Sequence, residues 1–337
     1  SQLHKEDYVD IGTPIVTVEH LGNRVFTEQN LPKVSDEDKA RLSKYVLKEG
    51  DIVFSRVGSV DRCSYVDAAH DGWMFSGRCL RVRPNTEVDP LYLYYFFCLE
   101  DTKQFVRNIA VGATMPSINT KLLGEVEVAY PSQTEQQKIV ALLSALDDKI
   151  EINQKINDNL YAQAKAIFAQ RFIGIETIPD GWKKGNLLDI ANYLNGLAMQ
   201  KFRPRDDEVG LPVLKIKELR QGSCDVSSEL CSPSIKPEYI VHDGDVIFSW
   251  SGSLLVDIWC GGTCGLNQHL FKVTSETYDQ WFYYLWTAHH LERFIAIAAD
   301  KATTMGHIKR GELEKAEVLI PSEKDYKEIS SLMNPLF

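Results

Sequence analysis

The most regular pattern of polar and apolar positions lies in the middle of the chain, between Pro131 and Phe172. Apolar side chains recur there every three or four residues, which is the spacing of one face of an α-helix. The segment has no Gly, its only Pro is the first residue, and Ser132 and Glu135 stand at the spacing of a capping box. We therefore predict one long helix over 131–172, about 60 Å long at about 1.5 Å per residue. The residues expected on its packing face are Ile139, Leu143, Leu146, Ile150, Asn153, Asn157, Leu160 and Ile167.

Periodicity alone leaves two interpretations of this helix open. A long amphipathic helix can lie on a single globular core. Alternatively, it separates two units and packs against another helix as in a coiled coil, because about 60 Å exceeds what one compact domain needs. Asn153 and Asn157 interrupt the stripe, and they either fix the register of a coiled coil or face solvent.

Three blocks of sequence before this helix recur after it in the same order. The clearest pair reads YVLKEGDIVFSRVGS and YIVHDGDVIFSWSGS. Similar offsets relate all three pairs, so short insertions in loops account for the differences, and we infer a duplicated unit. The paired blocks are 13–21 with 211–219, 45–59 with 239–253, and 113–132 with 303–322.

Each copy shows the same order of expected elements. Alternating apolar residues predict strands over IVTVEHL and VLKIKEL, over GRCLRVR and HLFKVT, and over EVEVAYP and KAEVLIP. A turn followed by a strand is expected at KEGDIVF and HDGDVIF. Aromatic-rich stretches at 91–110 and 280–299 predict helices.

The predicted fold class is therefore α/β (mixed α+β), with two tandem globular units separated by a long coiled-coil-type helix. The second copy repeats even the start of that helix, since Pro321 and Ser322 stand where Pro131 and Ser132 stood. This second helix stops at Phe337 and the first unit has a short opening segment, so we expect a chain shortened at both ends. The expected boundaries are 1–130 and 173–320 for the two units, 131–172 for the spacer helix, and 321–337 for the second helix.

Composition places the chain among ordinary globular proteins. Hydrophobic residues make up 44% and charged residues 25%, and no apolar run approaches the roughly 18 residues of a membrane-spanning helix. Seven cysteines, an odd number without a secretory signal, predict reduced thiols and a cytoplasmic location. The net charge of −10 argues mildly against a nucleic-acid partner, so any DNA contact requires a local basic cluster.

No motif predicts catalysis or metal binding by this chain. A GxGxxG loop, a P-loop and a zinc-type histidine motif are absent from the sequence. The nearest match to the N-P-P-[YF] motif of adenine methyltransferases is NPLF at 334–337, with Leu in the third place. The DDK triplet at 147–149 is superficially similar to a nuclease motif, but it lies in the middle of the predicted helix. We therefore predict a non-catalytic chain without a cofactor of its own.

The order of these features resembles the specificity subunit of type I restriction-modification systems. The resemblance covers the whole chain and rests on PSQTEQQKIVALLSALDDKIEINQKIN, on the paired GDIVFSRVGS and GDVIFSWSGS, and on IPDGW at 178–182. It implies two target recognition domains that each read half of a split DNA sequence, with two antiparallel helices as a spacer. It also implies partners: double-stranded DNA, two modification subunits that use S-adenosylmethionine to methylate adenine N6, and restriction/translocase subunits that use ATP and Mg²⁺.

Under this resemblance, side chains that can bond phosphates or base edges are candidates for DNA contact. Exposed Arg and Lys side chains are usually only solvated, so the clusters at 215–220 and 301–310 are stronger candidates than any single residue. In the first unit the candidates are Ser55, Arg56, Ser59, Arg78, Arg81, Arg83, Lys103, Arg107, Asn119 and Lys121. In the second unit they are Lys215, Lys217, Arg220, Ser251, Gln268, His269, Lys301, Thr303, Thr304, His307, Lys309 and Arg310.

A protein-binding scaffold with two adaptor domains is the alternative function. It also explains a duplicated unit on a helix, and it suits the acidic charge. Salt-dependent binding to duplex DNA in the presence of the modification subunit distinguishes the two functions.

Overall fold

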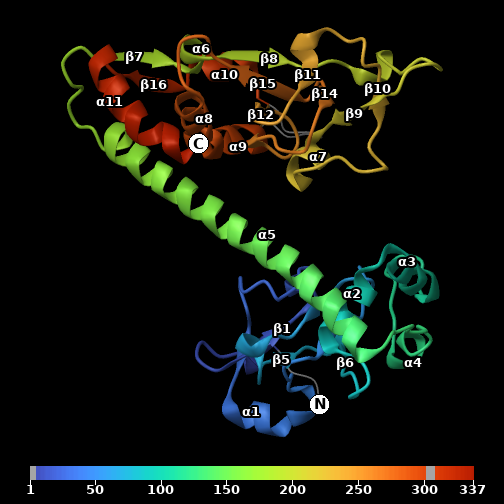
Figure 1. Ribbon diagram of the computed structural model, residues 1–337. Coiled ribbons are helices and arrows are strands. Elements are labelled where there is room, and N and C mark those ends of the chain that lie inside the picture. Colours follow the sequence, from blue (N-terminus) through green and yellow to red (C-terminus); the bar gives the residue numbers. More distant parts are fainter. Residues whose placement is uncertain (1–4, 301–307) are drawn as a thin grey trace. The chain divides into compact units, whose positions relative to one another are not determined.

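The chain forms two compact units, Ser1–Gln154 and Lys155–Phe337, which we call the first and the second unit (Figure 1). The computed structural model describes residues 5–300 and 308–337. The predicted long helix is confirmed as α5, Gln133–Phe168. Both units are mixed α/β, as predicted, and each has its own hydrophobic core.

From residue 5 onward, the first unit contains two small sheets. Their strands are β1 (Thr13–Val16), β2 (Lys33–Val34), β3 (Ile52–Ser55), β4 (Cys63–Tyr65), β5 (Met74–Phe75) and β6 (Cys79–Val82). The first sheet has the order β2-β1-β5, in which β1 pairs antiparallel with β2 and parallel with β5. The second sheet, β4-β3-β6, is antiparallel, and its central strand β3 is buried at all four positions.

The first unit has four helices before α5 among the residues that the structure describes. They are α1 (Asp36–Arg41), α2 (Pro90–Cys98), α3 (Glu100–Ile109) and α4 (Thr120–Leu123), with 3₁₀ turns at Lys5–Asp7, Val18–His20, Ser43–Tyr45 and Ala68–His70. Asp89 caps α2, because its carboxylate accepts bonds from the amides of Leu91 and Tyr92. The predicted helical stretch breaks at Leu99, whose backbone is extended, so α2 and α3 are separate helices.

The described part of the second unit contains three sheets. Their strands are β7 (Lys183–Asn186), β8 (Asn192–Asn195), β9 (Leu211–Leu214), β10 (Leu230–Cys231), β11 (Ile240–Val241), β12 (Val246–Ser249), β13 (Leu255–Ile258), β14 (Cys264–Leu266), β15 (Leu270–Thr274) and β16 (Glu317–Ile320). The sheet orders are β10-β9-β14-β11, β13-β12-β15-β8 and β16-β7. Only β9 and β14 pair in parallel among the described strands of this unit.

The helices of the second unit pack around an aromatic core. They are α6 (Leu187–Ile190), α7 (Ile216–Gln221), α8 (Gln280–His289), α9 (Leu291–Asp300), α10 (Arg310–Glu314) and α11 (Glu323–Met333), with a π-helical turn at Ala169–Ile173 and 3₁₀ turns at Met199–Lys201, Pro237–Tyr239 and Asn334–Leu336. Helix α8 packs against β13 and β15, and its residues 281–287 are all buried. Phe168 and Phe172, at the end of α5 and in the π-helical turn, belong to the same core.

The inferred duplication is visible in the topology. The order β2-β1-β5 recurs as β10-β9-β14, and β4-β3-β6 recurs as β13-β12-β15. Gly50 and Gly244 precede β3 and β12 with φ of 89° and 91°, a conformation that Gly adopts without steric cost. Asp51 and Asp245 follow them, and each carboxylate accepts a backbone amide three residues earlier at 2.8 Å.

The first turns of α5 and α11 are anchored to their units in the same way. In the first unit, the amide of Asp89 donates to Oε1 of Gln136 at 2.7 Å. In the second unit, the amide of Asp279, the residue before α8, donates to the hydroxyl of Tyr326 at 2.7 Å. Both acceptors lie in the first turns of their helices. Different side chains therefore make the same contact in the two copies.

Three predicted strands are wrong in part. The strand expected over 15–21 ends at Val16, and the strand expected over 213–219 ends at Leu214, where a turn of helix begins in each case. The reason is local: the amide of Thr17 bonds Nδ1 of His20 at 3.0 Å, and that of Lys215 bonds the carboxylate three residues on at 3.3 Å. Such back-bonding favours a helical start. The segment 125–131 is also not a strand, whereas its counterpart β16 is paired with β7.

The apolar face predicted on α5 is largely exposed within this chain. Ile139 is 38% exposed, Leu146 53% and Ile150 54%. Among the other predicted packing residues, Asn153 and Asn157 are exposed, Leu143 and Leu160 are half-buried, and Ile167 contacts the core of the second unit. Packing of this face against another helix stays a prediction.

Candidate nucleic-acid interface

Four of the predicted DNA-contact residues line one hollow in the second unit. Because β9 and β14 are parallel, their carboxyl ends meet at one edge of the sheet, where α/β proteins commonly bind ligands. The chain after β9 contributes Lys215 and Lys217, and the chain after β14 contributes Gln268 and His269. We call this space of about 420 Å³ the second hollow. Its remaining lining residues are Gln200, Arg203, Ile216, Glu229 and Asn267.

Acidic side chains hold the cations of the second hollow. Glu229 lies 2.6 Å from the ammonium of Lys215 and 3.3 Å from the guanidinium of Arg203. The hydrogen bond from Lys215 lowers the pKa of Glu229 below its usual value. Lys217 is 3.4 Å from Asp225. Exposed pairs of this kind add little stability, but they restrict where the donors of the hollow can lie.

A buried serine side chain contacts His269 and restricts its orientation. Its Nδ1 lies 3.0 Å from Oγ of Ser251, which is only 4% exposed, and its ring lies 6.0 Å from that of Trp250. Ser251 was itself a predicted DNA contact. In the structure it is buried and does not line the hollow, and its hydroxyl contacts His269.

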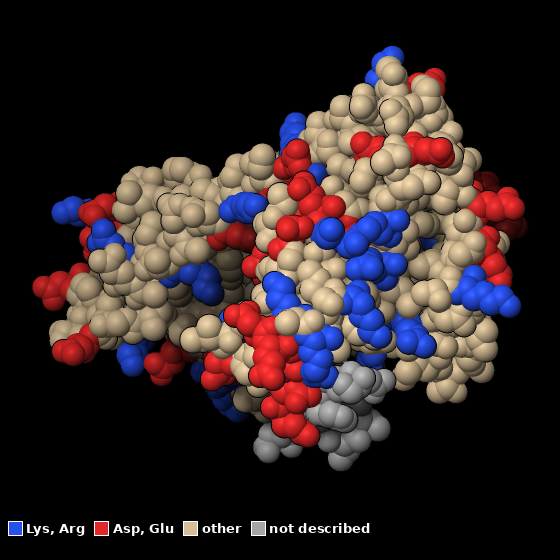
Figure 2. Space-filling model, turned by 90° about the horizontal axis from the view of Figure 1, so that it is seen from below, with Lys and Arg blue, Asp and Glu red and all other residues tan. Residues whose placement is uncertain are grey.

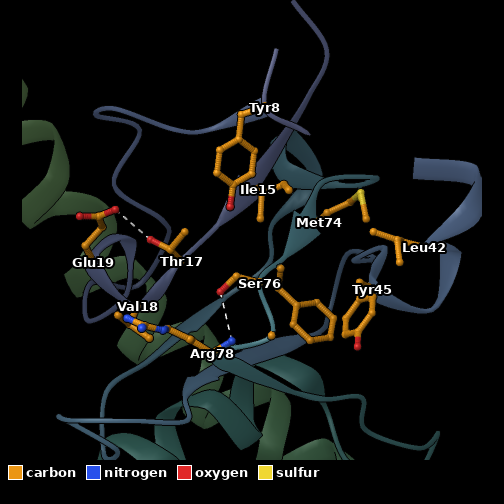
Figure 3. A pocket seen from close by; sticks show the side chains of 12 residues that line it. Tyr8, Ile15, Thr17, Val18, Glu19, Leu42, Tyr45, Met74, Ser76 and Arg78 are labelled. Atoms are coloured by element: carbon orange, nitrogen blue, oxygen red, sulfur yellow. Dashed lines mark hydrogen bonds between the residues drawn. The ribbon is translucent and has the colours of Figure 1, made fainter. Parts of the chain in front are cut away.

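The first unit has a hollow of about 500 Å³ at the corresponding edge, after the parallel strands β1 and β5 (Figure 3). We call it the first hollow. One side carries polar groups: the hydroxyl of Thr17 donates to Glu19 at 3.0 Å, and the amide of Arg78 donates to the hydroxyl of Ser76 at 3.3 Å. Tyr8 stands over it. The other lining residues are Ile15, Val18, Leu42, Tyr45, Met74, Phe75 and Gly77.

Arg78 also lines a neighbouring hollow of about 470 Å³ together with two other predicted residues, Arg56 and Asn119. The side-chain oxygen of Asn119 accepts the amides of Lys121 and Leu122, which starts α4. The structure therefore brings Arg56, Arg78 and Asn119 together on one face of the first unit.

Other candidates of the first unit have contacts within the protein. Arg83 pairs with the buried carboxylate of Asp51 at 2.6 Å, Arg107 pairs with Asp61 at 2.6 Å, and Arg81 donates to a backbone carbonyl at 2.9 Å. These contacts give each side chain a structural role, and DNA contact by them stays a prediction. Of the remaining candidates, Ser55 is buried, Lys103 is half-buried, and Ser59 and Lys121 are exposed.

The remaining candidates of the second unit are spread over several elements. Arg310 donates to the carbonyl of Tyr193 at 3.2 Å, and Arg220 lies 3.5 Å from the hydroxyl of Ser253. Lys309 is exposed at the start of α10. Lys301, Thr303, Thr304 and His307 lie outside the described residues.

The comparison with known families follows this division into two units. A family model described as the type I restriction modification DNA specificity domain matches residues 2–162 and again residues 179–337. The chain belongs to this family.

Several curated relatives are named as specificity subunits of type I restriction enzymes. The type I restriction enzyme MjaIX specificity subunit of Methanocaldococcus jannaschii is 26% identical over 351 residues, which cover 96% of this chain and 80% of the relative. The EcoKI specificity subunit of Escherichia coli is 23% identical and covers 99% of this chain and 76% of its own length. A HindI specificity subunit of Haemophilus influenzae matches 42% of this chain at 29% identity, over 32% of its own length.

A solved structure supports the fold of the two specificity domains. The S subunit of a type I restriction-modification system from M. genitalium aligns over 99% of this chain and 84% of its own, with a TM-score of 0.54 at 15% identity. The predicted fold class, with two tandem α/β domains and a long helix between them, is thereby confirmed.

The surface charge of the specificity domains is mixed. On the face shown in Figure 2, Lys and Arg side chains group near the middle and acidic side chains group beside them. A local interface with DNA, as expected from the net charge of −10, stays a prediction. Within the described residues, no helix is long and apolar enough to cross a membrane, and no three His, Cys, Asp or Glu side chains form a group able to hold a metal ion.

Several lining residues of the two hollows were not among the predicted contacts. Thr17, Glu19 and Ser76 line the first hollow, and Arg203 and Asn267 line the second. Thr17 and Glu19 lie in the repeated block 13–21, whereas the other three lie outside the repeated blocks. Thr17, Glu19 and Ser76 come together because the parallel strands β1 and β5 end side by side. A position-by-position comparison of the two copies of the sequence could have identified such residues, because it shows at which positions the repeated units differ.

Proposed function

We propose that this chain is the DNA specificity subunit of a type I restriction-modification complex, in which each unit reads one half of a bipartite target. The observation that carries the proposal is the double match to a DNA specificity domain, one match in each unit. The scaffold alternative explains the duplication but gives no reason for that match.

The hollows supply the chemistry that base reading requires. Base edges in the major groove present hydrogen-bond donors and acceptors in patterns that differ between base pairs. Lys217 and Gln268 offer donors and a carbonyl oxygen in the second hollow, and Glu19 and Arg78 offer an acceptor and donors in the first. Exposed Lys and Arg outside the hollows would contact phosphates and fix the position of each unit on the duplex.

Helix α5 would give the two readers a fixed separation. It has no Pro or Gly between its first and last residues, so no hinge is expected within it. Gln136 fixes its start to the first unit, and Phe168 buries its end in the core of the second. Spacing between half-sites then becomes part of the specificity.

The partner subunits would carry out the chemical reactions. In this proposal two modification subunits dock on the helices and methylate adenine N6 with S-adenosylmethionine. Restriction/translocase subunits add cleavage that depends on ATP and Mg²⁺. The chain itself contributes recognition and geometry.

Binding to duplex DNA at several salt concentrations tests the proposal. The chain co-purified with its modification subunit is expected to bind its target with log K falling by about 0.9 per neutralised phosphate for each unit of log salt. It should also prefer the target to a duplex with both half-sites scrambled. A complex that binds both duplexes equally, or binds neither, would contradict the proposal and favour the scaffold.

A further inference from the structure

The two hollows occupy the same place in the duplicated unit. Strand registers establish this: Val16 pairs with Phe75 across β1 and β5, and Leu214 pairs with Leu266 across β9 and β14. The three residues that follow each paired strand end line the hollow of their unit: 17–19 and 76–78 in the first unit, and 215–217 and 267–269 in the second. Thr17 therefore corresponds to Lys215, Glu19 to Lys217 and Arg78 to His269.

The framework beneath the hollows is the same in both copies. The hydroxyls of Ser55 and Ser249 each donate to the carbonyl two residues on, at 2.7 and 3.2 Å. Arg81 and Lys272, which hold the same register position on β6 and β15, each donate to a backbone carbonyl, that of Val46 at 2.9 Å and that of Ile240 at 3.0 Å. These supporting residues therefore make equivalent contacts in the two copies.

The hollows themselves differ in charge and in bonding groups. Glu19 and Lys217 have opposite charges at one position, and Gly77 of the first hollow corresponds to Gln268 of the second. Lys215 and Lys217 bring ammonium donors to the second hollow. In the first hollow the hydroxyl of Thr17 donates to the Glu19 carboxylate (Figure 3). Glu19 therefore presents a hydrogen-bond acceptor at the position where Lys217 presents a donor in the second hollow.

We propose that these equivalent hollows are where each unit reads base edges of its half-site, and that the residues differing between them make the two half-sites differ in sequence. This inference rests on the proposed function and adds to it the specificity-determining positions. The position shared by Glu19 and Lys217 is the central one. A carboxylate accepts a bond from cytosine N4, whereas an ammonium donates to guanine O6 and N7, so the two units should select different bases there.

Two substitutions with matched controls test the assignment. Glu19→Lys gives position 19 of the first hollow the charge that Lys217 has in the second, and Glu127→Lys makes the same change at an exposed position of the first unit that lines neither hollow. Lys217→Gln removes the ammonium from the second hollow, and exposed Lys236→Gln is its control. Each variant is co-expressed with the modification subunit, and methylated adenines are mapped across the host genome.

The wild-type complex is expected to methylate one split motif. Glu19→Lys should change base preference about 5- to 150-fold at a position in one half-site only, and Lys217→Gln at a position in the other half-site only. The control variants should keep the wild-type motif. For a variant that methylates nothing, selection of bound duplexes from libraries randomised in one half-site measures the same preference.

Two results would overturn the inference. If the wild type gives a split motif and both hollow variants keep it, or lose preference equally in both half-sites, the hollows do not read bases. If the wild-type complex gives no split motif, the proposed function itself fails, and the assignment of the hollows fails with it.

Discussion

The side chain of Gln136 fixes the start of α5 to the first unit, and its loss is predicted to release that anchor. Gln136 is 0% exposed. Its Oε1 accepts the amide of Asp89 at 2.7 Å, and its Nε2 donates to the carbonyls of Glu87 and Pro131 at 3.2 and 2.9 Å. Substitution Gln136→Leu keeps a similar side-chain volume and removes all three hydrogen bonds.

The expected loss follows from the number of bonds. A hydrogen bond of this kind contributes about 1 kcal/mol net, so the free energy of local opening should fall by about 3 kcal/mol. Because about 1.4 kcal/mol is a factor of ten, this corresponds to roughly 100-fold more frequent opening of the helix start.

Native-state hydrogen exchange of the whole chain measures this opening. The Asp89 amide and the amides of the first turns of α5 should exchange roughly 100-fold faster in Gln136→Leu than in the wild type. The matched control is Gln137→Leu, at the next position, which is exposed. Equal protection in both variants would refute the role given to Gln136.

Three further predictions concern other parts of the two units. Arg24, whose side chain is 17% exposed, pairs with two carboxylates of α5 at 2.5 and 2.9 Å, so Arg24→Ala should destabilise the first unit by about 1–2 kcal/mol in a thermal melt. Burial lowers the pKa of His290 from 6.5, so the unfolded chain takes up that proton first, and stability of the second unit should fall as the pH drops below about 6.5. The hydrogen bond with Cys63 lowers the pKa of Cys98 to about 7, whereas burial raises that of Cys79 to about 11, so iodoacetamide at about pH 8 should alkylate Cys98 before Cys79.

Each of these three predictions can be contradicted by a specific result. Lys149→Ala, an exposed change on the same helix, should leave the melt of the first unit unchanged, and an equal loss there would remove the case for Arg24. The slope of stability against pH should flatten in His290→Gln, and an unchanged slope would assign it to another group. Equal alkylation of Cys98 and Cys79, resolved by peptide mass spectrometry, would contradict the predicted pKa order.

The long helix and the duplication could be predicted from the sequence alone, because the helix follows from the local spacing of apolar residues and the duplication from the repeated blocks. The apolar period from Ile139 onward, interrupted at Asn153 and Asn157, needs no knowledge of tertiary contacts, and the paired GDIVFSRVGS and GDVIFSWSGS align without a structure. The strand predicted over 15–21 failed because it depended on alternation alone. There the bond from the amide of Thr17 to His20 ended the strand and started a helical turn.

The candidate site was less predictable because it depends on which loops meet. Lys217 and Gln268 are far apart in sequence and come together only through the parallel pairing of β9 and β14. Conversely, the side chain of Arg83 is of a type that commonly contacts DNA, but in the structure it is paired with the buried carboxylate of Asp51. Residue type identifies what a side chain can bind, and only the fold decides what it meets.

The most direct test of the central claim is a map of methylated adenines in cells that express this chain with its modification subunit. The account predicts a single motif made of two short specified sequences separated by a fixed number of unspecified bases. Deleting one heptad from the exposed middle of α5 should then shorten or abolish that gap while the specified sequences stay the same. Methylation without a split motif, or a motif whose two halves vary freely in spacing, would contradict the account.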